Sequence, residues 1–134
     1  MAKQKILLVE DDSFLSNMYA TKLELEGYEV VIAEDGEAGY EKAVSEKPDV
    51  ILLDIMLPKL DGFGVLEKVR SNDATQSVPV ILLTNLSQDE DIQKGLSLGA
   101  NDFLVKAHFM PSEVVKKIKI LIDGDSEKKE GEEE

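Results

Sequence analysis

The chain has 134 residues, of which 43% are hydrophobic and 32% charged, with a formal net charge of -13 and no cysteine. This length suits a single domain that buries its own core. The lack of cysteine excludes disulfides and thiolate metal sites, and no stretch approaches the roughly 20 apolar residues of a membrane-spanning helix. The negative charge opposes non-specific attraction to nucleic acid or anionic membranes. We therefore expect a soluble cytoplasmic protein that binds neither nucleic acid nor membranes directly.

The C-terminal segment differs from the rest of the chain in composition. From Gly124 to Glu134 the sequence is GDSEKKEGEEE, which has no apolar residue. Such a segment has nothing to bury in a core, so it predicts a disordered acidic tail over 124–134, after one domain over 1–123. A solubilising appendage, a linker towards another module and an acidic docking segment all fit this composition.

Before the tail, short apolar runs alternate with segments of helical spacing. The runs predict five strands, at Ile6–Val9, Val30–Ala33, Val50–Leu53, Val80–Leu83 and Phe103–Val105. The intervening and following segments predict five helices, as the spacing of Val65, Leu66 and Val69 illustrates. Residues suited to helix caps, helix ends and a first helical turn agree with these bounds, namely Ser13, Ser87, Gly27, Gly99 and Pro111.

The alternation of strands and helices predicts the fold class. Strands that are apolar throughout indicate a parallel sheet covered on both faces, joined by right-handed crossovers. The expected fold is therefore a doubly wound α/β domain. In such domains, ligands bind beyond the carboxyl ends of the strands, where the strand order reverses.

Polar residues follow four of the predicted strands, where each apolar run ends. Because parallel strands end at one edge of the sheet, these side chains should converge although they are far apart in the sequence. They are Glu10, Asp11 and Asp12 after the first strand, Asp54 after the third, Thr84 and Asn85 after the fourth, and Lys106 after the fifth.

The convergence of carboxylates predicts a metal and a phosphorylated substrate. Clustered carboxylates repel one another unless a cation lies between them. An all-oxygen site suits Mg²⁺, which also binds phosphate oxygens. With Lys106 as a second positive charge and Thr84 as a hydrogen-bond donor, the edge could stabilise a phosphoryl group during transfer to a carboxylate. Asp54 is the natural acceptor.

Four motifs in order carry a resemblance to a known family. They are ILLVEDD at Ile6–Asp12, VILLDIMLPKLDGFGVL at Val50–Leu66, VPVILLT at Val78–Thr84 and GANDFLVK at Gly99–Lys106. With them, the chain from Lys5 to about Ile122 resembles the receiver domain of bacterial two-component response regulators, in its stand-alone, chemotaxis-regulator-like form. The resemblance implies a flavodoxin-like sheet of five parallel strands, in the spatial order 2-1-3-4-5, flanked by five helices.

The resemblance also implies a role for each acidic residue. Asp54 would accept a phosphoryl group from a histidine kinase or a phosphotransfer protein. Mg²⁺ would be held by Asp11 directly, by Glu10 through water, by the Asp54 carboxylate and by the backbone carbonyl of Met56. Asp12 is a further candidate ligand, and it is equally suited to capping the following helix.

The remaining implied roles concern the switch and its output. Thr84 would bond a phosphoryl oxygen, Lys106 would pair with the phosphate, and Phe103 would follow Thr84 inward as the aromatic switch residue. The fourth helix, fifth strand and fifth helix would form the face that binds an output partner protein. The protein would then be a signalling domain that assists its own phosphorylation and slow dephosphorylation, and no enzyme in the ordinary sense. We expect a monomer, with phosphorylation-dependent dimerisation as the alternative.

The sequence departs from the family pattern at two positions. The family usually has proline after the lysine, joined by a cis bond, whereas this chain has Ala107. Because a cis bond before a non-proline residue costs about 2.5–4 kcal/mol, we predict a trans bond between Lys106 and Ala107. The second departure is Asn85, where Ala or Ser is commoner, and it bears on how far Thr84 can travel.

The same residues also fit simpler roles. Glu10, Asp11 and Asp12 could together cap a helix, and Phe103 could simply fill the core. A binding module of receiver fold that is never phosphorylated is the second functional hypothesis. A hydrolase of the haloacid-dehalogenase type is disfavoured, because it needs a second Asp two positions after Asp54, where this chain has Met56.

Overall fold

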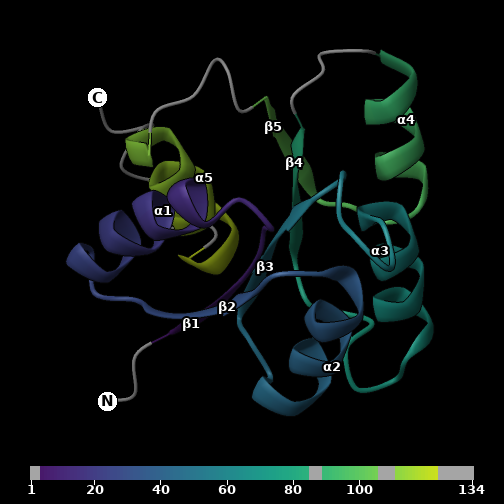
Figure 1. Cartoon of the computed structure of the whole chain (residues 1–134), viewed down its shortest axis with the longest axis horizontal. Coiled ribbons are helices and arrows are strands. Elements are labelled where there is room, and N and C mark those ends of the chain that lie inside the picture. The colour runs from purple at the N-terminus through teal and green to yellow at the C-terminus, as the bar shows by residue number, and fades with distance from the viewer. Residues whose placement is uncertain (1–3, 85–88, 106–110, 124–134) are drawn as a thin grey trace.

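The computed structural model describes residues 4–84, 89–105 and 111–123. Within these residues, five strands alternate with five helices (Figure 1). In chain order they are β1 Lys5–Val9, α1 Ser13–Leu25, β2 Glu29–Ala33, α2 Gly36–Glu46, β3 Val50–Asp54, α3 Gly62–Ser71, β4 Val80–Thr84, α4 Asp89–Ser97, β5 Asp102–Val105 and α5 Pro111–Asp123. Several predictions fall outside the described residues, namely those on the tail, Asn85, Ser87, Lys106 and the Lys106–Ala107 bond.

The strands form one parallel sheet in the order β2-β1-β3-β4-β5, which confirms the predicted fold class and strand order. The chain passes from β1 outward to β2, then returns to β3 on the other side of β1. The order therefore reverses between β1 and β3, where Val9 lies opposite Leu53. This pair immediately precedes Glu10 and Asp54, so the polar residues stand at the point where such sheets bind ligands.

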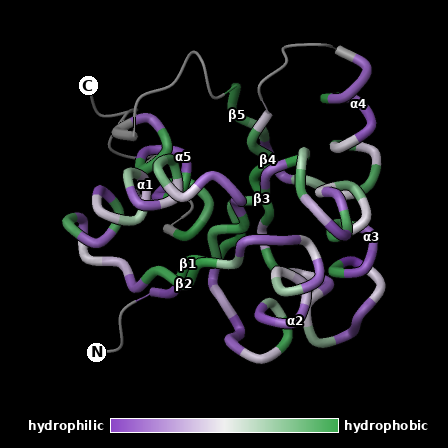
Figure 2. Tube along the Cα trace, in the orientation of Figure 1, coloured by the Kyte–Doolittle hydropathy of each residue, from purple (hydrophilic) through white to green (hydrophobic). Residues whose placement is uncertain are grey.

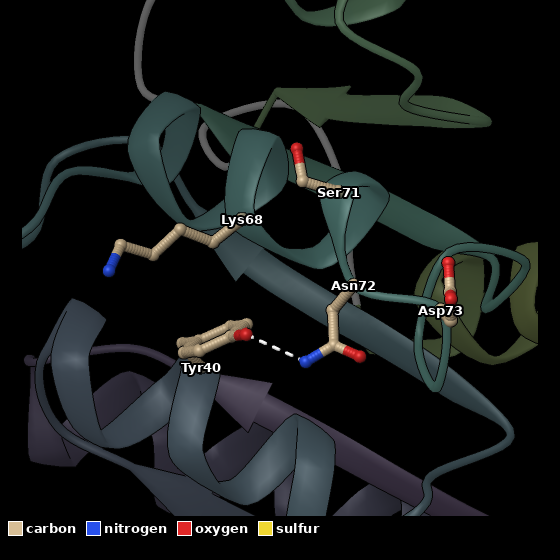
Figure 3. Close-up of a pocket in the computed structure, with 5 residues that line it drawn as sticks. All are labelled: Tyr40, Lys68, Ser71, Asn72 and Asp73. Atoms are coloured by element: carbon tan, nitrogen blue, oxygen red, sulfur yellow. Dashed lines mark hydrogen bonds between the residues drawn. The ribbon is translucent and has the colours of Figure 1, made fainter.

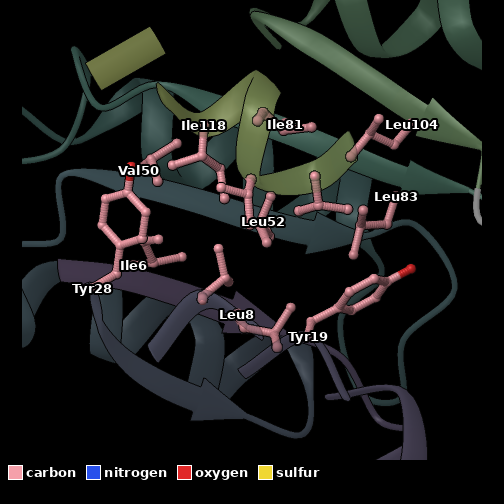
Figure 4. Packing of buried hydrophobic residues seen from close by; sticks show 13 residues of the cluster. Ile6, Leu8, Tyr19, Tyr28, Val50, Leu52, Ile81, Leu83, Leu104 and Ile118 are labelled. Carbon is pink, nitrogen blue, oxygen red and sulfur yellow. The ribbon is translucent and has the colours of Figure 1, made fainter. Parts of the chain in front are cut away.

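Helices cover both faces of the sheet: α1 and α5 lie on one face, and α2, α3 and α4 on the other (Figure 1). Successive strand residues point to opposite faces, so each strand contributes to two hydrophobic clusters. In the cluster beneath α1 and α5, Leu8 and Leu52 meet Tyr19 of α1 and Ile118 of α5 (Figure 4). Hydrophobic residues accordingly concentrate in the central strands (Figure 2), as expected for strands buried on both faces.

The ends of the elements differ slightly from the prediction. Asp54 and Thr84 are the last residues of β3 and β4, and do not follow them, because they still pair with Leu83 and Val105. Gly27 and Gly99 follow α1 and α4 with positive φ angles of 98° and 110°, as their position after helices predicted.

The predicted cap Ser13 is wrong, because Asp12 caps α1. The Asp12 Oδ1 accepts hydrogen bonds from the N–H groups of Phe14 at 2.9 Å and Leu15 at 3.2 Å. Ser13 is the first residue of the helix. A carboxylate satisfies these amides and also meets the positive end of the helix dipole.

Arg70 in the last turn of α3 ties two connections to that helix. Its guanidinium donates to the carbonyl oxygens of Gly99 at 2.7 and 2.9 Å and of Val78 at 2.6 Å, and to Asn101 Oδ1 at 2.9 Å. Asn101 Oδ1 also accepts from the first amide of β4, that of Val80. Burial lowers the pKa of Arg70, but the group stays charged at neutral pH. This residue therefore fixes the C-terminal end of α4 relative to α3 and β4.

We predict that Arg70→Lys lowers the free energy of unfolding by about 1–3 kcal/mol, because lysine keeps the charge but lacks the planar fork that reaches several carbonyls. Urea denaturation measures the loss. Glu67→Gln, at an exposed position of the same helix, is the matched control and should change stability by less than about 0.5 kcal/mol. Equal stability of the Arg70→Lys protein and this control would contradict the role given to Arg70.

Candidate functional site

Three carboxylates meet at the carboxyl edge of β1 and β3. Glu10 directly follows β1, and its N–H continues the strand ladder by donating to Ala33 O at 3.0 Å. The Glu10 side chain is 1% exposed and Asp54 is 3% exposed, whereas Asp11 is exposed. One carboxylate oxygen from each of the three lies within 4.8 Å of the others. The structure thus brings together three of the four side chains predicted as metal ligands.

Asp12, the fourth of these side chains, has a structural partner of its own. The carboxylate that caps α1 is exposed to solvent. The backbone N–H of Asp12 donates to Glu10 Oε2 at 3.2 Å. This residue therefore fixes the start of α1 and one oxygen of Glu10, and it is not part of the three-carboxylate cluster.

The loop after β3 lies beside the cluster. Ile55 N–H donates to Leu83 O at 3.1 Å, so the backbone remains tied to β4 for one residue beyond β3. The next amide, that of Met56, donates to Asp54 Oδ1 at 3.2 Å and orients this carboxylate. The Met56 side chain is 66% exposed. A hollow of about 560 Å³ opens here, lined by Asp11, Ile55, Met56, Leu57, Pro58, Asp61, Phe63 and Asp91.

Two further predicted residues lie on the neighbouring strands. Thr84 is 3% exposed at the end of β4, next to β3. Phe103 on β5 is half-buried and packs against the hydrophobic cluster on the α2–α3 side of the sheet. Lys106 lies outside the described residues. The structure therefore places Thr84 at the expected edge and gives Phe103 a core contact, consistent with either interpretation of that aromatic residue.

The donor set of the cluster fits a magnesium ion. All its side chains offer oxygen, which is the ligand that Mg²⁺ prefers. Negative charges this close repel one another, and two of the three are removed from water, which increases the repulsion. A divalent cation among them would relieve it. The Met56 carbonyl, two residues beyond Asp54, is the main-chain oxygen that could join them.

A second hollow lies away from this edge, between α2 and α3 (Figure 3). It measures about 440 Å³ and is lined by Tyr40, Lys68, Ser71, Asn72 and Asp73. Asn72 Nδ2 donates to Tyr40 Oη at 2.8 Å, and Lys68 Nζ lies 5.3 Å from the centre of the Tyr40 ring. None of the described residues that line it was predicted as a site residue, whereas Asp11 lines the hollow beside Met56.

Comparison with known proteins identifies the family. Residues 6–119 match the response regulator receiver domain, and the chain belongs to this family. One curated relative is the DNA-binding dual master transcriptional regulator RpaA of Synechocystis sp., which is 40% identical over 118 residues. That match covers 88% of this chain and 48% of RpaA. The chain spans about half the length of the curated relatives it matches.

Solved structures of receiver domains match the fold over nearly their whole length. Chemotaxis protein CheY4 of Vibrio cholerae has a TM-score of 0.84 and 32% identity, over 90% of this chain and 99% of CheY4. The receiver domain of sensor histidine kinase PA1611 from Pseudomonas aeruginosa also has a TM-score of 0.84 and 32% identity, over 92% and 100% of the two chains. That structure has a magnesium ion coordinated in its active-site cleft.

These similarities establish that the chain is a receiver domain of two-component systems, which is a signalling domain of the phosphorylation-switch type. Receiver domains accept phosphate from histidine kinases and bind Mg²⁺ at an acidic site, and this chain has an acidic cluster. RpaA is named as DNA-binding, which conflicts in part with the expectation that nucleic acid is not bound. For this chain, that expectation stays a prediction. Among the described residues, no helix is long and apolar enough to cross a membrane.

The structure adds one residue that the sequence did not single out as part of the site. A Cβ on Gly62, the first residue of α3, would overlap the backbone oxygen of Asp54 and lie 2.7 Å from Ile55 Cα. Gly62 could not be singled out from the sequence, because close approach between two backbone segments leaves no periodic pattern. The only available signal was that Gly62 is a small residue shortly after Asp54 and Met56, which were predicted to bind the metal.

We predict that Mg²⁺ stabilises the folded protein and that Asp54→Asn stabilises the metal-free protein, because both reduce carboxylate repulsion. At a concentration of about 100 times its dissociation constant, Mg²⁺ adds about 2.7 kcal/mol to the free energy of unfolding, and this raises the melting temperature by several degrees. Thermal melts with Mg²⁺ and with EDTA measure both effects. Asp73→Asn removes the same charge at an exposed position and should leave the response to Mg²⁺ unchanged. Melts insensitive to Mg²⁺ and to Asp54→Asn would exclude a shared cation site.

Proposed function

We propose that this protein is a phosphorylation-activated switch, in which Asp54 accepts a phosphoryl group from a histidine kinase or phosphotransfer protein. The observation that carries the proposal is the cluster of Glu10, Asp11 and Asp54 oxygens within 4.8 Å at the reversal point of a receiver-domain sheet. The hollow beside Met56 and Asp11 gives a phosphorylated donor room to approach.

The proposed transfer forms one bond and breaks one. An oxygen of the Asp54 carboxylate attacks phosphorus, and an O–P bond forms while the N–P bond of the donor phosphohistidine breaks. The electron pair of the broken bond stays on the imidazole nitrogen, which takes up a proton from water. The hydrogen bond from Met56 N–H to Oδ1 holds the carboxylate in one orientation, which favours attack. Asp54 then carries an acyl phosphate.

The proposed metal ligands are Asp11, the Asp54 carboxylate and the Met56 backbone carbonyl, with Glu10 acting through water. When bound, Mg²⁺ supplies positive charge to the phosphoryl oxygens. Thr84 is proposed to donate a hydrogen bond to a phosphoryl oxygen, and Lys106 to pair with the phosphate. Thr84 is buried one strand away from Asp54, which supports its part in this arrangement.

The output is proposed to be a change of affinity for a partner protein at the face formed by α4, β5 and α5. Phe103 on β5 is the proposed link between Thr84 and that face. It is half-buried and packs against the hydrophobic cluster on the α2–α3 side of the sheet. Cytoplasmic location and a monomer that dimerises only after phosphorylation, if at all, stay predictions.

Two alternatives fit the site less well. A binding module of receiver fold that is never phosphorylated has no use for Glu10 and Asp54 buried together at the sheet edge, where their repulsion lowers stability. A hydrolase with an Asp nucleophile needs an acid two positions on, and the exposed Met56 side chain offers none. The switch uses every residue of the cluster.

We predict that the protein gains one phosphate when incubated with Mg²⁺ and a phosphoramidate or acetyl phosphate, and that Asp54→Asn abolishes this gain while keeping the size of the side chain. Intact mass measures both. Asp73→Asn should be phosphorylated like the wild type, and EDTA should suppress the reaction. A phosphate gained by Asp54→Asn, or none gained by the wild type with a competent donor, would refute the proposal.

We predict that the phosphorylated state decays slowly by itself, so that its removal depends on a phosphatase or on transfer back to the kinase. Hydrolysis needs a water in line with the O–P bond, and Met56 and Leu86, two positions after Asp54 and Thr84, offer no strong donor or acceptor to orient it. Asn85 or Gln88 orienting the water is the alternative.

The decay of phosphorylated wild type, Met56→Asn and Leu86→Glu tests this prediction. Each substitution introduces a polar group that can orient the water, so we expect hydrolysis several-fold faster than in the wild type. If neither variant decays faster, side chains at these positions do not limit the reaction.

A further inference from the structure

We infer that Gly36, the first residue of α2, is a positioning residue for the metal site: it holds the loop that carries the Met56 carbonyl and so sets the affinity for Mg²⁺. The inference rests on the proposed metal site. Gly36 itself is not a ligand, and it belongs to α2, whereas none of the three carboxylates of the cluster lies in a helix.

Gly36 touches the main chain of the loop after β3. Its N–H donates to Pro58 O at 3.2 Å. A Cβ on Gly36 would overlap the backbone oxygen of Leu60 and lie 2.6 Å from the Leu60 carbonyl carbon. Only glycine allows so close an approach between the start of α2 and the loop. Any larger residue must displace main-chain atoms, because no side-chain rotation can move that oxygen.

A second contact holds the same loop against α2. Asp35, the N-cap of α2, accepts from Ala38 N–H at 2.8 Å through Oδ1, and its Oδ2 lies 3.7 Å from Lys59 Nζ. Lys59 has a φ angle of 70°, in the left-handed region that a non-glycine residue seldom adopts. The loop therefore turns at Lys59 and meets the first turn of α2 through Lys59 and its neighbours Pro58 and Leu60.

The loop is also fixed at its two ends. Ile55 N–H is bonded to Leu83 O, and Gly62 N–H donates to Ile55 O at 2.8 Å, which closes the loop onto the end of β3. Met56 lies between these closures and the contact with Gly36. With both ends held, a displacement of the backbone at Leu60 has to be absorbed within 55–61, the short segment that carries the Met56 carbonyl.

Mg²⁺ is sensitive to such a displacement. It requires near-octahedral geometry with oxygens at about 2.0–2.1 Å. Carboxylate side chains can adjust by rotation, whereas a carbonyl ligand follows the main chain. Residues that orient a ligand from outside the metal shell typically change metal affinity by about 10–100-fold when replaced. The contact between Gly36 and Leu60 is placed to have this kind of effect.

The chain offers a matched pair of variants. Gly64, near the start of α3, also approaches Leu60, but a Cβ there would lie 2.6 Å from Cδ1, the flexible tip of that side chain. Gly64→Ala should therefore be accommodated by rotation of the Leu60 side chain, whereas Gly36→Ala must shift the loop. Calorimetric titration with Mg²⁺ measures affinity, and thermal melts in EDTA measure the stability of the metal-free proteins.

We expect Gly36→Ala to weaken Mg²⁺ binding about tenfold and Gly64→Ala to leave it within about twofold of the wild type. If Gly36→Ala loses stability in EDTA but keeps wild-type affinity for Mg²⁺, its role is only structural and the inference fails. Absence of Mg²⁺ binding by the wild type would instead refute the proposed metal site itself.

A second variant covers the case in which Gly36→Ala does not fold. Lys59→Gly leaves Gly36 intact but removes the ion pair to Asp35, and glycine makes the backbone at this left-handed position more flexible. The Lys59 side chain is exposed, so its removal leaves no cavity. Like Gly36→Ala, it should weaken Mg²⁺ binding, by about two- to fivefold, with little loss of stability in the metal-free protein. Unchanged affinity in this variant would overturn the inference.

Discussion

The parallel direction of all five strands is the constraint on which the site depends. It brings the carboxyl ends of the strands to one edge, and the return of the chain across β1 to β3 places Glu10 beside Asp54. A buried cluster of like charges is costly to build. The apolar strands offset this cost, because β1, β3 and β4 are covered on both faces by hydrophobic clusters. The stability of the sheet thus supports an edge whose charges oppose folding.

Main-chain contacts position the loop that lies beside the three carboxylates. Two glycines at the starts of α2 and α3, Gly36 and Gly62, allow these helices to approach the loop after β3 more closely than any side chain would permit. Together with the hydrogen bond from Met56 N–H to Asp54, they fix the backbone next to Asp54. In the proposed site, side chains positioned by the strands would therefore be joined by a main-chain oxygen positioned by helix packing. Arg70 in turn fixes the C-terminal end of α4 through its hydrogen bonds to the Gly99 carbonyl oxygen.

Much of this arrangement could be predicted from the sequence. Apolar runs with polar ends located the strands to within one residue, and the parallel order then implied that Glu10, Asp11 and Asp54 meet. The sequence offered both Ser13 and Asp12 as caps of α1, because both are good caps, and only the hydrogen bonds show that Asp12 is the cap. The contact of Gly36 with Leu60 could not be predicted, since it joins the start of α2 to the loop after β3 without any periodic signal.

A crystal structure of the protein grown with Mg²⁺ near neutral pH tests the central claim most directly. We expect one octahedral ion at the carboxyl edge of the sheet, bound at about 2.0–2.1 Å by oxygens of Asp11 and Asp54 and by the Met56 carbonyl, with waters at the remaining positions. An edge without an ion at saturating Mg²⁺, or an ion held by other residues while Asp54 makes no contact with it, would contradict the claim.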